Sequence, residues 1–158
     1  MADRITEDTI RGWIDNELVE SVDTMPDPEA DVNLLVEMSN IMIHIIYREP
    51  GGPILIGQEI EYDDQIQSRI QGLSESDRGE LVSRVRETLT TVPVIYGFTD
   101  ETGANVHFAE MQRIFLECRI YPDSISQQTV MARLVDVWKA MRYLDDLVTV
   151  MDAIEREK

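Results

Sequence analysis

The sequence predicts an α+β domain of two layers, in which helices cover an antiparallel sheet of about five strands in the order α-βββ-α-ββ-α. Two patterns carry this prediction. Apolar residues alternate with a period of two in stretches bounded by turn residues, and the period changes to 3.6 before, between and after these stretches. The 158 residues, 43% of them hydrophobic, are enough to bury one core. We therefore expect a single domain over residues 1–158.

The first helix is expected over residues 6–19. Its apolar side chains fall at the three-to-four spacing of one helix face: Ile10, Trp13, Ile14 and Leu18. Thr6 is the expected N-cap, because a hydroxyl can accept a hydrogen bond from an N–H group of the first turn. Two prolines in residues 25–29 exclude a helix there, because proline lacks the N–H donor.

Three strands are expected next, over residues 32–38, 41–48 and 54–62. Ser39 and Asn40 form a separator short enough for a hairpin turn, and residues 49–53 form a longer loop rich in glycine and proline. An antiparallel meander is therefore the expected topology. In the second of these strands, apolar side chains lie on both faces rather than on one. Such a strand must be covered twice.

The second half of the chain is expected to alternate helix, two strands and helix. Residues 63–91 fit one helix, or two joined by a kink near Gly72. Strands follow over residues 94–99 and 112–121. The last helix is expected over residues 124–155, where Ser124 and Gln127 have the form of a capping box. Its apolar stripe is wide, which favours packing on a sheet over a helical dimer seam.

One face of the predicted sheet forms the core: Val32, Leu34, Val36, Ile41, Ile43, Ile45, Ile54, Ile56, Ile60, Ile114, Leu116 and Ile120. The opposite face, which we call the second face, carries the candidate partner-binding residues among charged side chains: Leu35, Met42, Ile46, Leu55, Phe115 and Tyr121. A monomer seldom leaves such a patch bare. The helix of residues 63–91, a second copy of the chain, or a peptide with basic residues is expected to cover it.

The net charge of −17, from 31 acidic and 14 basic residues, produces a field that repels a phosphate backbone, so we expect no nucleic-acid partner. The acidity has two explanations: solubility, particularly in a salty cytoplasm, or attraction of a basic partner. No apolar run is long enough for a membrane helix, and the first residues do not form a signal peptide. We therefore expect no membrane partner and a cytoplasmic location. Cys118 lies in an apolar strand pattern and is expected to be a buried, inert thiol.

No catalytic motif is found, and we assign no catalytic, cofactor or metal residues. His107 with Glu110 is a weak ligand pair, below the three or four ligands of a zinc site. The pairs Asp63-Asp64 and Asp145-Asp146 fit a helix start and a polar helix face. Residues 100–105 depart from a calcium loop, and residues 51–53 lack the lysine and hydroxyl of a phosphate-binding loop. His44 is expected to be a hydrogen-bonded sheet histidine.

The order of the elements, together with residues 5–18 and 41–56, resembles the type III secretion chaperone fold (Tir chaperone-like) and its YbjN-like relatives. Within that group the chain is most similar to a family of uncharacterised archaeal proteins. The resemblance implies a small acidic homodimer that binds a partly unfolded segment of a client protein, although it does not carry over any client of a secretion apparatus.

The expected function is therefore a non-enzymatic protein-interaction module, chaperone-like or adaptor, which binds a peptide through a sheet face or a dimer groove and needs no cofactor. One alternative is a metal-dependent enzyme or small-ligand binder that uses His107, Glu110 and nearby carboxylates. The other is a structural subunit of a larger complex.

Overall fold

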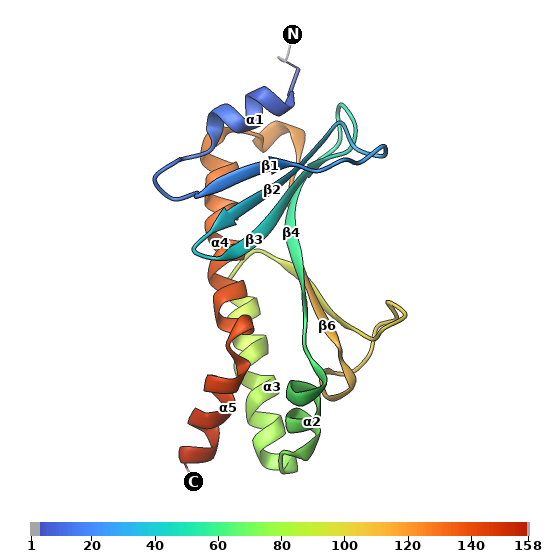
Figure 1. Cartoon of the computed structure of the whole chain (residues 1–158), viewed down its shortest axis with the longest axis vertical. Coiled ribbons are helices and arrows are strands. Elements are labelled where there is room, and N and C mark those ends of the chain that lie inside the picture. Colours follow the sequence, from blue (N-terminus) through green and yellow to red (C-terminus); the bar gives the residue numbers. More distant parts are fainter. Residues whose placement is uncertain (1–3, 158) are drawn as a thin grey trace. The chain divides into compact units, whose positions relative to one another are not determined.

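Over residues 4–157, which the computed structural model describes, the chain forms one antiparallel six-stranded sheet with five α-helices (Figure 1). The strands are β1 (Ser21–Thr24), β2 (Val32–Met38), β3 (Ile41–Tyr47), β4 (Ile54–Glu61), β5 (Ile95–Thr99) and β6 (Arg113–Ile120). Their order in the sheet is β1-β2-β3-β4-β6-β5. The helices are α1 (Glu7–Trp13), α2 (Asp64–Gly72), α3 (Glu75–Thr90), α4 (Gln127–Asp145) and α5 (Leu147–Arg156). The predicted α+β class and antiparallel sheet are confirmed, with one more strand than expected.

The described chain divides into two compact units, each built from two separate segments. Unit 1 comprises residues 4–58 and 117–138, and unit 2 comprises residues 59–116 and 139–157. The boundaries fall inside β4, β6 and α4, so these three elements run from one unit into the other. No helix within residues 4–157 has both the length and the apolar character needed to cross a membrane.

The β2–β3 hairpin is the local element that the sequence specifies most sharply. Met38 pairs with Ile41, and the two residues between them have positive φ angles, 47° at Ser39 and 68° at Asn40. This left-handed pair is the geometry of a two-residue turn whose twist matches that of the strands. At the other end of the hairpin Val32 pairs with Tyr47. The turn therefore fixes which residues of both strands share a face.

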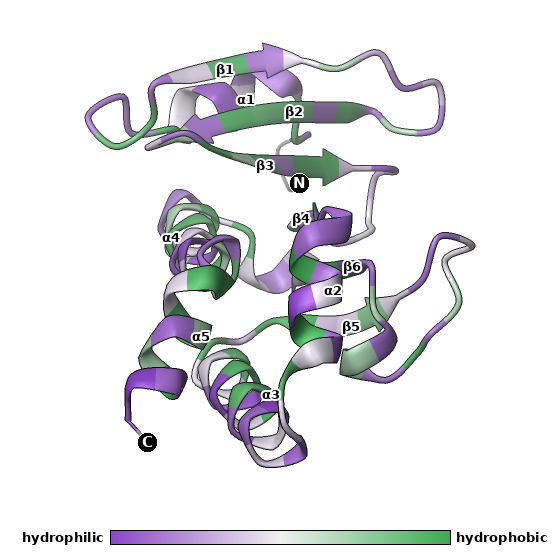
Figure 2. Cartoon of the chain, turned by 60° about the horizontal axis from the view of Figure 1, so that its bottom comes forward, coloured by the Kyte–Doolittle hydropathy of each residue, from purple (hydrophilic) through white to green (hydrophobic). Residues whose placement is uncertain are grey.

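The core of unit 1 lies on the predicted core face. Burial alternates at every residue of β2 and β3, and polar bands interrupt the hydrophobic colour of both strands in Figure 2. The residues of α4 that belong to this unit contribute three fully buried side chains: Val130, Leu134 and Val137. The indole Nε1 of Trp138 donates a hydrogen bond to the carbonyl oxygen of Met38 at 3.1 Å, which ties α4 to β2.

The first helix is shorter than predicted. Thr6 is its N-cap, in a reciprocal capping box with Thr9, but the helix ends at Trp13. Leu18, expected on the buried face, is 50% exposed, and Val19 is buried instead. The chain then forms β1, which the sequence analysis did not predict. Arg11 anchors the helix to this strand, because its guanidinium donates to the Val22 carbonyl and to the Thr24 hydroxyl.

Unit 2 contains the kinked helix pair. α2 ends at Gly72 and α3 begins after Ser74, whose hydroxyl accepts a hydrogen bond from the N–H of Asp77. Leu81, Val85 and Leu89 of α3 are buried. α3 packs against α5, and the guanidinium of Arg84 on α3 reaches Glu157 at 2.6 Å. Residues 63–91 therefore form two helices, one of the two arrangements that the sequence allowed.

The last helical region differs from its prediction in two ways. The reciprocal capping bonds join Ser126 and Thr129 rather than Ser124 and Gln127, since residues 122–124 form a short 3₁₀ turn that begins at Pro122. The helix also breaks at Asp146, which has non-helical backbone angles and separates α4 from α5. The buried hydroxyl of Tyr62 donates to the Leu144 carbonyl at 2.5 Å, just before this break.

Candidate functional site

Four of the six candidate partner-binding residues lie together on the second face of unit 1. The strand register places Ile46 directly opposite Leu55. Leu35 and Met42 lie on the same face, at alternate positions of β2 and β3. Leu35, Met42 and Ile46 are half-buried, and Leu55 is 8% exposed. The structure therefore forms an apolar surface in unit 1 from residues that the sequence selected.

The other two candidates have different surroundings. Phe115 belongs to unit 2, where its ring covers Gly97 of β5, and a Cβ atom at Gly97 would lie 2.7 Å from Cζ of that ring. Phe115 therefore has a packing role inside its own unit. Tyr121 belongs to unit 1 and lies just beyond the end of β6, with 59% of its surface exposed.

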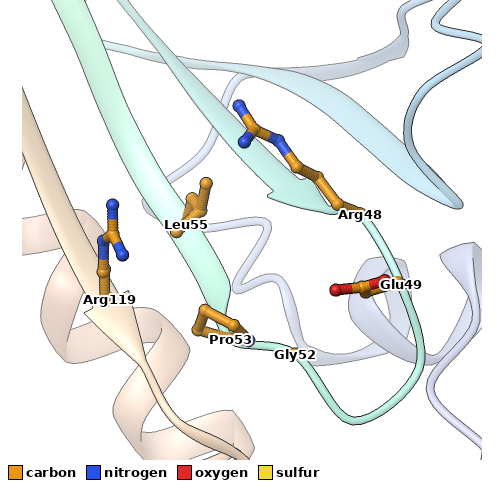
Figure 3. A pocket seen from close by; sticks show the side chains of 6 residues that line it. All are labelled: Arg48, Glu49, Gly52, Pro53, Leu55 and Arg119. Carbon is orange, nitrogen blue, oxygen red and sulfur yellow. The ribbon is translucent and has the colours of Figure 1, made fainter.

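A pocket of about 190 Å³ opens over Leu55, and we call it the Leu55 pocket. The residues that line it all belong to unit 1: Arg48, Glu49, Gly52, Pro53, Leu55 and Arg119. Figure 3 shows the side chains of Arg48 and Arg119 on opposite sides of Leu55, with the loop of Glu49, Gly52 and Pro53 closing one end. The pocket therefore has an apolar floor and two cationic walls.

Strand geometry explains this arrangement. Arg48 follows β3 directly, two positions after Ile46, so its side chain projects from the same face. Arg119 is on β6, and β4, which carries Leu55, lies between β3 and β6. Neighbouring strands are about 4.8 Å apart, so the two arginine backbones stand roughly 10 Å apart across Leu55. Two long side chains can converge from that separation on one group above the leucine.

The two arginines differ in their partners. Arg119 Nε donates to Glu117 Oε2 at 2.9 Å, and this hydrogen bond, with a smaller effect of the adjacent Tyr121, raises the pKa of the guanidinium. The guanidinium of Arg48 forms no hydrogen bond or ion pair with any residue in the described part of the chain. Its charge helps to lower the pKa of Asp27, after the larger effects of hydrogen bonds from Asn33 and the Glu29 N–H. The N–H donors of the Arg48 guanidinium are therefore available to a ligand.

A polar chain of three side chains lies beside the apolar surface. Asn33 Nδ2 donates to Asp27 Oδ2 at 2.9 Å, and Asn33 Oδ1 lies 3.3 Å from His44 Nδ1. Burial lowers the pKa of His44, so this imidazole is neutral at pH 7. His44 is thus a hydrogen-bonded sheet histidine, as expected, and adds no positive charge to the second face.

The weak metal candidates gain no further ligand. His107 and Glu110 are exposed at the start and end of a 3₁₀ turn, joined by a backbone hydrogen bond from Glu110 N to His107 O. Within residues 4–157 no group of three histidine, cysteine, aspartate or glutamate side chains is placed to hold a metal ion. Asp63 is the N-cap of α2, and Asp100 accepts hydrogen bonds from Thr102 and from the N–H of Ala104 inside its own turn.

A second pocket, of about 240 Å³, is also in unit 1. It is mainly apolar and lies where α4 meets the β2–β3 turn: Glu17, Leu18, Met38, Ser39, Val135 and Trp138 line it. The exposed Leu18 belongs to this pocket, so the residue that α1 fails to bury contributes to a surface hollow instead.

A protein-family model matches most of the chain. Residues 6–148 match the model of the family described as "Uncharacterized conserved protein (DUF2299)". The chain belongs to this family. A search among curated proteins gave no significant match.

A solved structure has the same fold as this DUF2299 chain. It is the crystal structure of an uncharacterized protein from Methanothermobacter thermautotrophicus, which superposes with a TM-score of 0.69 at 22% sequence identity. The match covers 97% of this chain and 99% of the archaeal one. At this identity the likeness concerns the fold, over nearly the whole length of both chains.

Sequence reasoning missed the cationic walls of the Leu55 pocket. The second face was defined by its apolar residues, so neither Arg48 nor Arg119 was selected. A signal was present, because both arginines alternate in phase with apolar second-face residues, Arg48 with Ile46 and Arg119 with Phe115 and Tyr121. Their convergence on Leu55 depends on the strand order β3-β4-β6, which alternation within single strands does not reveal.

Proposed function

We propose that this DUF2299 protein is a non-enzymatic protein-interaction module, chaperone-like or adaptor, that binds an extended peptide segment on the second face of unit 1. One observation carries the proposal: the apolar surface of Leu35, Met42 and Ile46 leads to the Leu55 pocket, which has an apolar floor and charged walls. Protein interfaces commonly combine a buried apolar centre with a polar rim rich in arginine.

The proposal includes a type III secretion chaperone-like fold class, a homodimer and a cytoplasmic location. The small size, the acidity and the succession of a helix, a strand meander, helices, further strands and C-terminal helices support this class. A homodimer would remove the same apolar surface from water in both copies. The partner peptide and the second copy are therefore two possible uses of one surface, and the following experiment separates them.

The test replaces Met42 with aspartate, which places a charge on the apolar surface. Light scattering measures the oligomeric state, and affinity capture from the native cell at native salt measures partner recovery. We expect Met42→Asp to lose partner recovery, dimerisation or both, with an unchanged circular dichroism spectrum. Phe115 is unsuitable for this test because its ring packs on Gly97.

Val148→Asp is the matched control, because Val148 is an apolar residue of α5, 38% exposed, in unit 2. It introduces the same charge in the other unit and should leave both measurements unchanged. If the Met42→Asp protein recovers the same partners with the same oligomeric state as the wild type, the proposed interaction surface is wrong.

A further inference from the structure

We propose that the Leu55 pocket binds the C-terminal carboxylate of a partner peptide whose last side chain is apolar. Arg48 and Arg119 would hold the carboxylate, and Leu55 with Pro53 would contact the side chain. The inference rests on the proposed function, since it names the chemistry that the same surface recognises. It also makes a separate claim about one pocket, which can fail by itself.

Charge complementarity is the first argument. A guanidinium group has several N–H donors in a planar fork that matches the two oxygens of a carboxylate. Arg48 uses none of these donors within residues 4–157, and the hydrogen bond of Arg119 to Glu117 uses only its Nε. Both guanidinium groups lie beside the floor of the pocket (Figure 3). An anion above Leu55 would thus meet two cations from opposite sides.

The size of the pocket is the second argument. Its volume of about 190 Å³ is below the range of roughly 300–1,000 Å³ that is typical of sites for cofactors and drug-sized ligands. Leu55 is 8% exposed and Pro53 is half-buried, so the floor is apolar but accessible at its centre. A pocket of this size and lining fits one terminal residue, with its side chain on the floor and its carboxylate between the walls.

The closed end of the pocket favours a chain terminus over a residue within a chain. The loop of residues 49–53 forms this end, where β3 stops and β4 begins (Figure 3).

The N–H groups of Gly51 and Gly52 already donate, to the Tyr47 hydroxyl at 3.2 Å and to the Glu49 carbonyl at 3.1 Å. These two amides therefore do not form a nest for phosphate, and the anion contacts fall to the arginines.

Glu49 allows a test of whether the bound ligand is negatively charged. Its carboxylate also lines the pocket, and it forms no ion pair with Arg48 or Arg119. A bound carboxylate is repelled by this like charge, so Glu49→Gln should strengthen binding. The gain should be roughly two- to fivefold, the range that exposed charge pairs usually show. A cationic ligand would instead bind more weakly to the Glu49→Gln protein.

Two small probes that differ only in charge test the inference on the whole chain. N-acetyl-L-leucine carries the carboxylate and the apolar side chain, whereas N-acetyl-L-leucinamide replaces the carboxylate with a neutral amide. Nuclear magnetic resonance titration of the ¹⁵N-labelled protein follows the backbone amides of Gly52 and Leu55. We expect saturable shifts with N-acetyl-L-leucine and at least tenfold weaker binding of the amide.

Arginine variants locate the site. Arg48→Gln and Arg119→Gln should each weaken the binding of N-acetyl-L-leucine, and the double variant should abolish the shifts at Leu55. Arg86→Gln is the matched control, because Arg86 is an exposed arginine of α3 in unit 2, and it should bind like the wild type. Circular dichroism checks that the variants keep their fold, and both target side chains are on the surface.

Four results would overturn the inference. The amide could bind as well as the acid, or the double arginine variant could bind like the wild type. Inorganic phosphate or acetate could bind as tightly as N-acetyl-L-leucine, which would make the pocket a site for bare anions. Free L-leucine could bind tenfold more tightly, which would indicate a free amino acid whose ammonium contacts Glu49. If any of these occurs while Met42→Asp still loses its partner, the interaction surface stands and only the carboxylate chemistry fails.

Discussion

The contact between Gly97 and Phe115 leads to a prediction whose sign depends on one aromatic ring. In Gly97→Ala the new methyl group would overlap Cε1 of Phe115 and lie 2.7 Å from Cζ. Carbon atoms in contact are ordinarily about 3.5–4.0 Å apart, so the ring has to move. No positive φ angle is involved at Gly97, which means that the backbone itself tolerates alanine.

Two opposing effects set the magnitude. Overpacking a well-filled site costs about 1–3 kcal/mol, and alanine gains about 0.5–1 kcal/mol over glycine in a regular element, because glycine loses more backbone entropy on folding. Phe115 is half-buried, so its ring can swing partly outward, and the lower part of the overpacking range applies. We expect Gly97→Ala to lower the free energy of unfolding by about 0.5 kcal/mol. Removal of the ring should reverse the sign.

Urea denaturation of a double-mutant cycle measures this effect. In a Phe115→Ala background the same Gly97→Ala change should stabilise the protein by about 0.5–1 kcal/mol. Gly79→Ala in α3 is a control, because a Cβ atom there meets nothing within 4 Å. It should stabilise by a similar amount in both backgrounds. Equal effects of Gly97→Ala with and without the ring would refute the packing argument.

Measurements on three residues test hydrogen bonding and burial. Tyr62→Phe should lower the free energy of unfolding by about 1–3 kcal/mol, because the Leu144 carbonyl loses its buried donor, whereas Tyr143→Phe should change it by less than about 0.5 kcal/mol. Burial raises the pKa of Tyr62, so wild-type stability is lost above the unfolded tyrosine pKa near 10, and the deficit of Tyr62→Phe should shrink by about 1.4 kcal/mol at pH 11 in urea titrations. Burial also raises the pKa of Cys118 to about 11, so iodoacetamide should label the native thiol at pH 8 roughly a hundredfold more slowly than the unfolded one, and equal rates would contradict its burial. Arg11→Ala should speed hydrogen exchange of the β1 amides by about tenfold, through loss of two hydrogen bonds, and unchanged exchange would show that the helix does not hold this strand.

The sequence predicted the central strands because the alternation of apolar residues and the turn residues on either side indicate the same strands. The bounds of β2 match the prediction residue for residue, and every predicted core-face residue is buried. β1 was missed because its four residues contain one apolar side chain, Val22, and the strand lies at the edge of the sheet. The break at Asp146 was missed because the apolar spacing continues through it, and backbone angles at one residue leave no trace in that spacing.

The sequence predicted the apolar floor of the candidate site, Leu55, but not its cationic walls, Arg48 and Arg119. Leu55 was selected because alternation places it on the second face. The packing of Phe115 on Gly97 was not predicted, because the absence of a side chain at Gly97 creates the place for its ring, and a glycine gives no apolar signal in the sequence. Contacts between strands that are distant in the chain require the sheet order, which periodicity within each strand cannot supply.

Each of the two units is built from two separate segments of the chain, and this has a consequence for synthesis on the ribosome. The β2–β3 hairpin can form as soon as it emerges, but the helix residues that cover its core face, Val130, Leu134 and Val137, are made more than 80 residues later. Unit 2 likewise waits for residues 139–157. The apolar face of the hairpin is therefore exposed during most of translation, and a nascent chain stalled at residue 116 would lack segments of both units. Such a chain is prone to aggregate through that face until the last helices leave the exit tunnel.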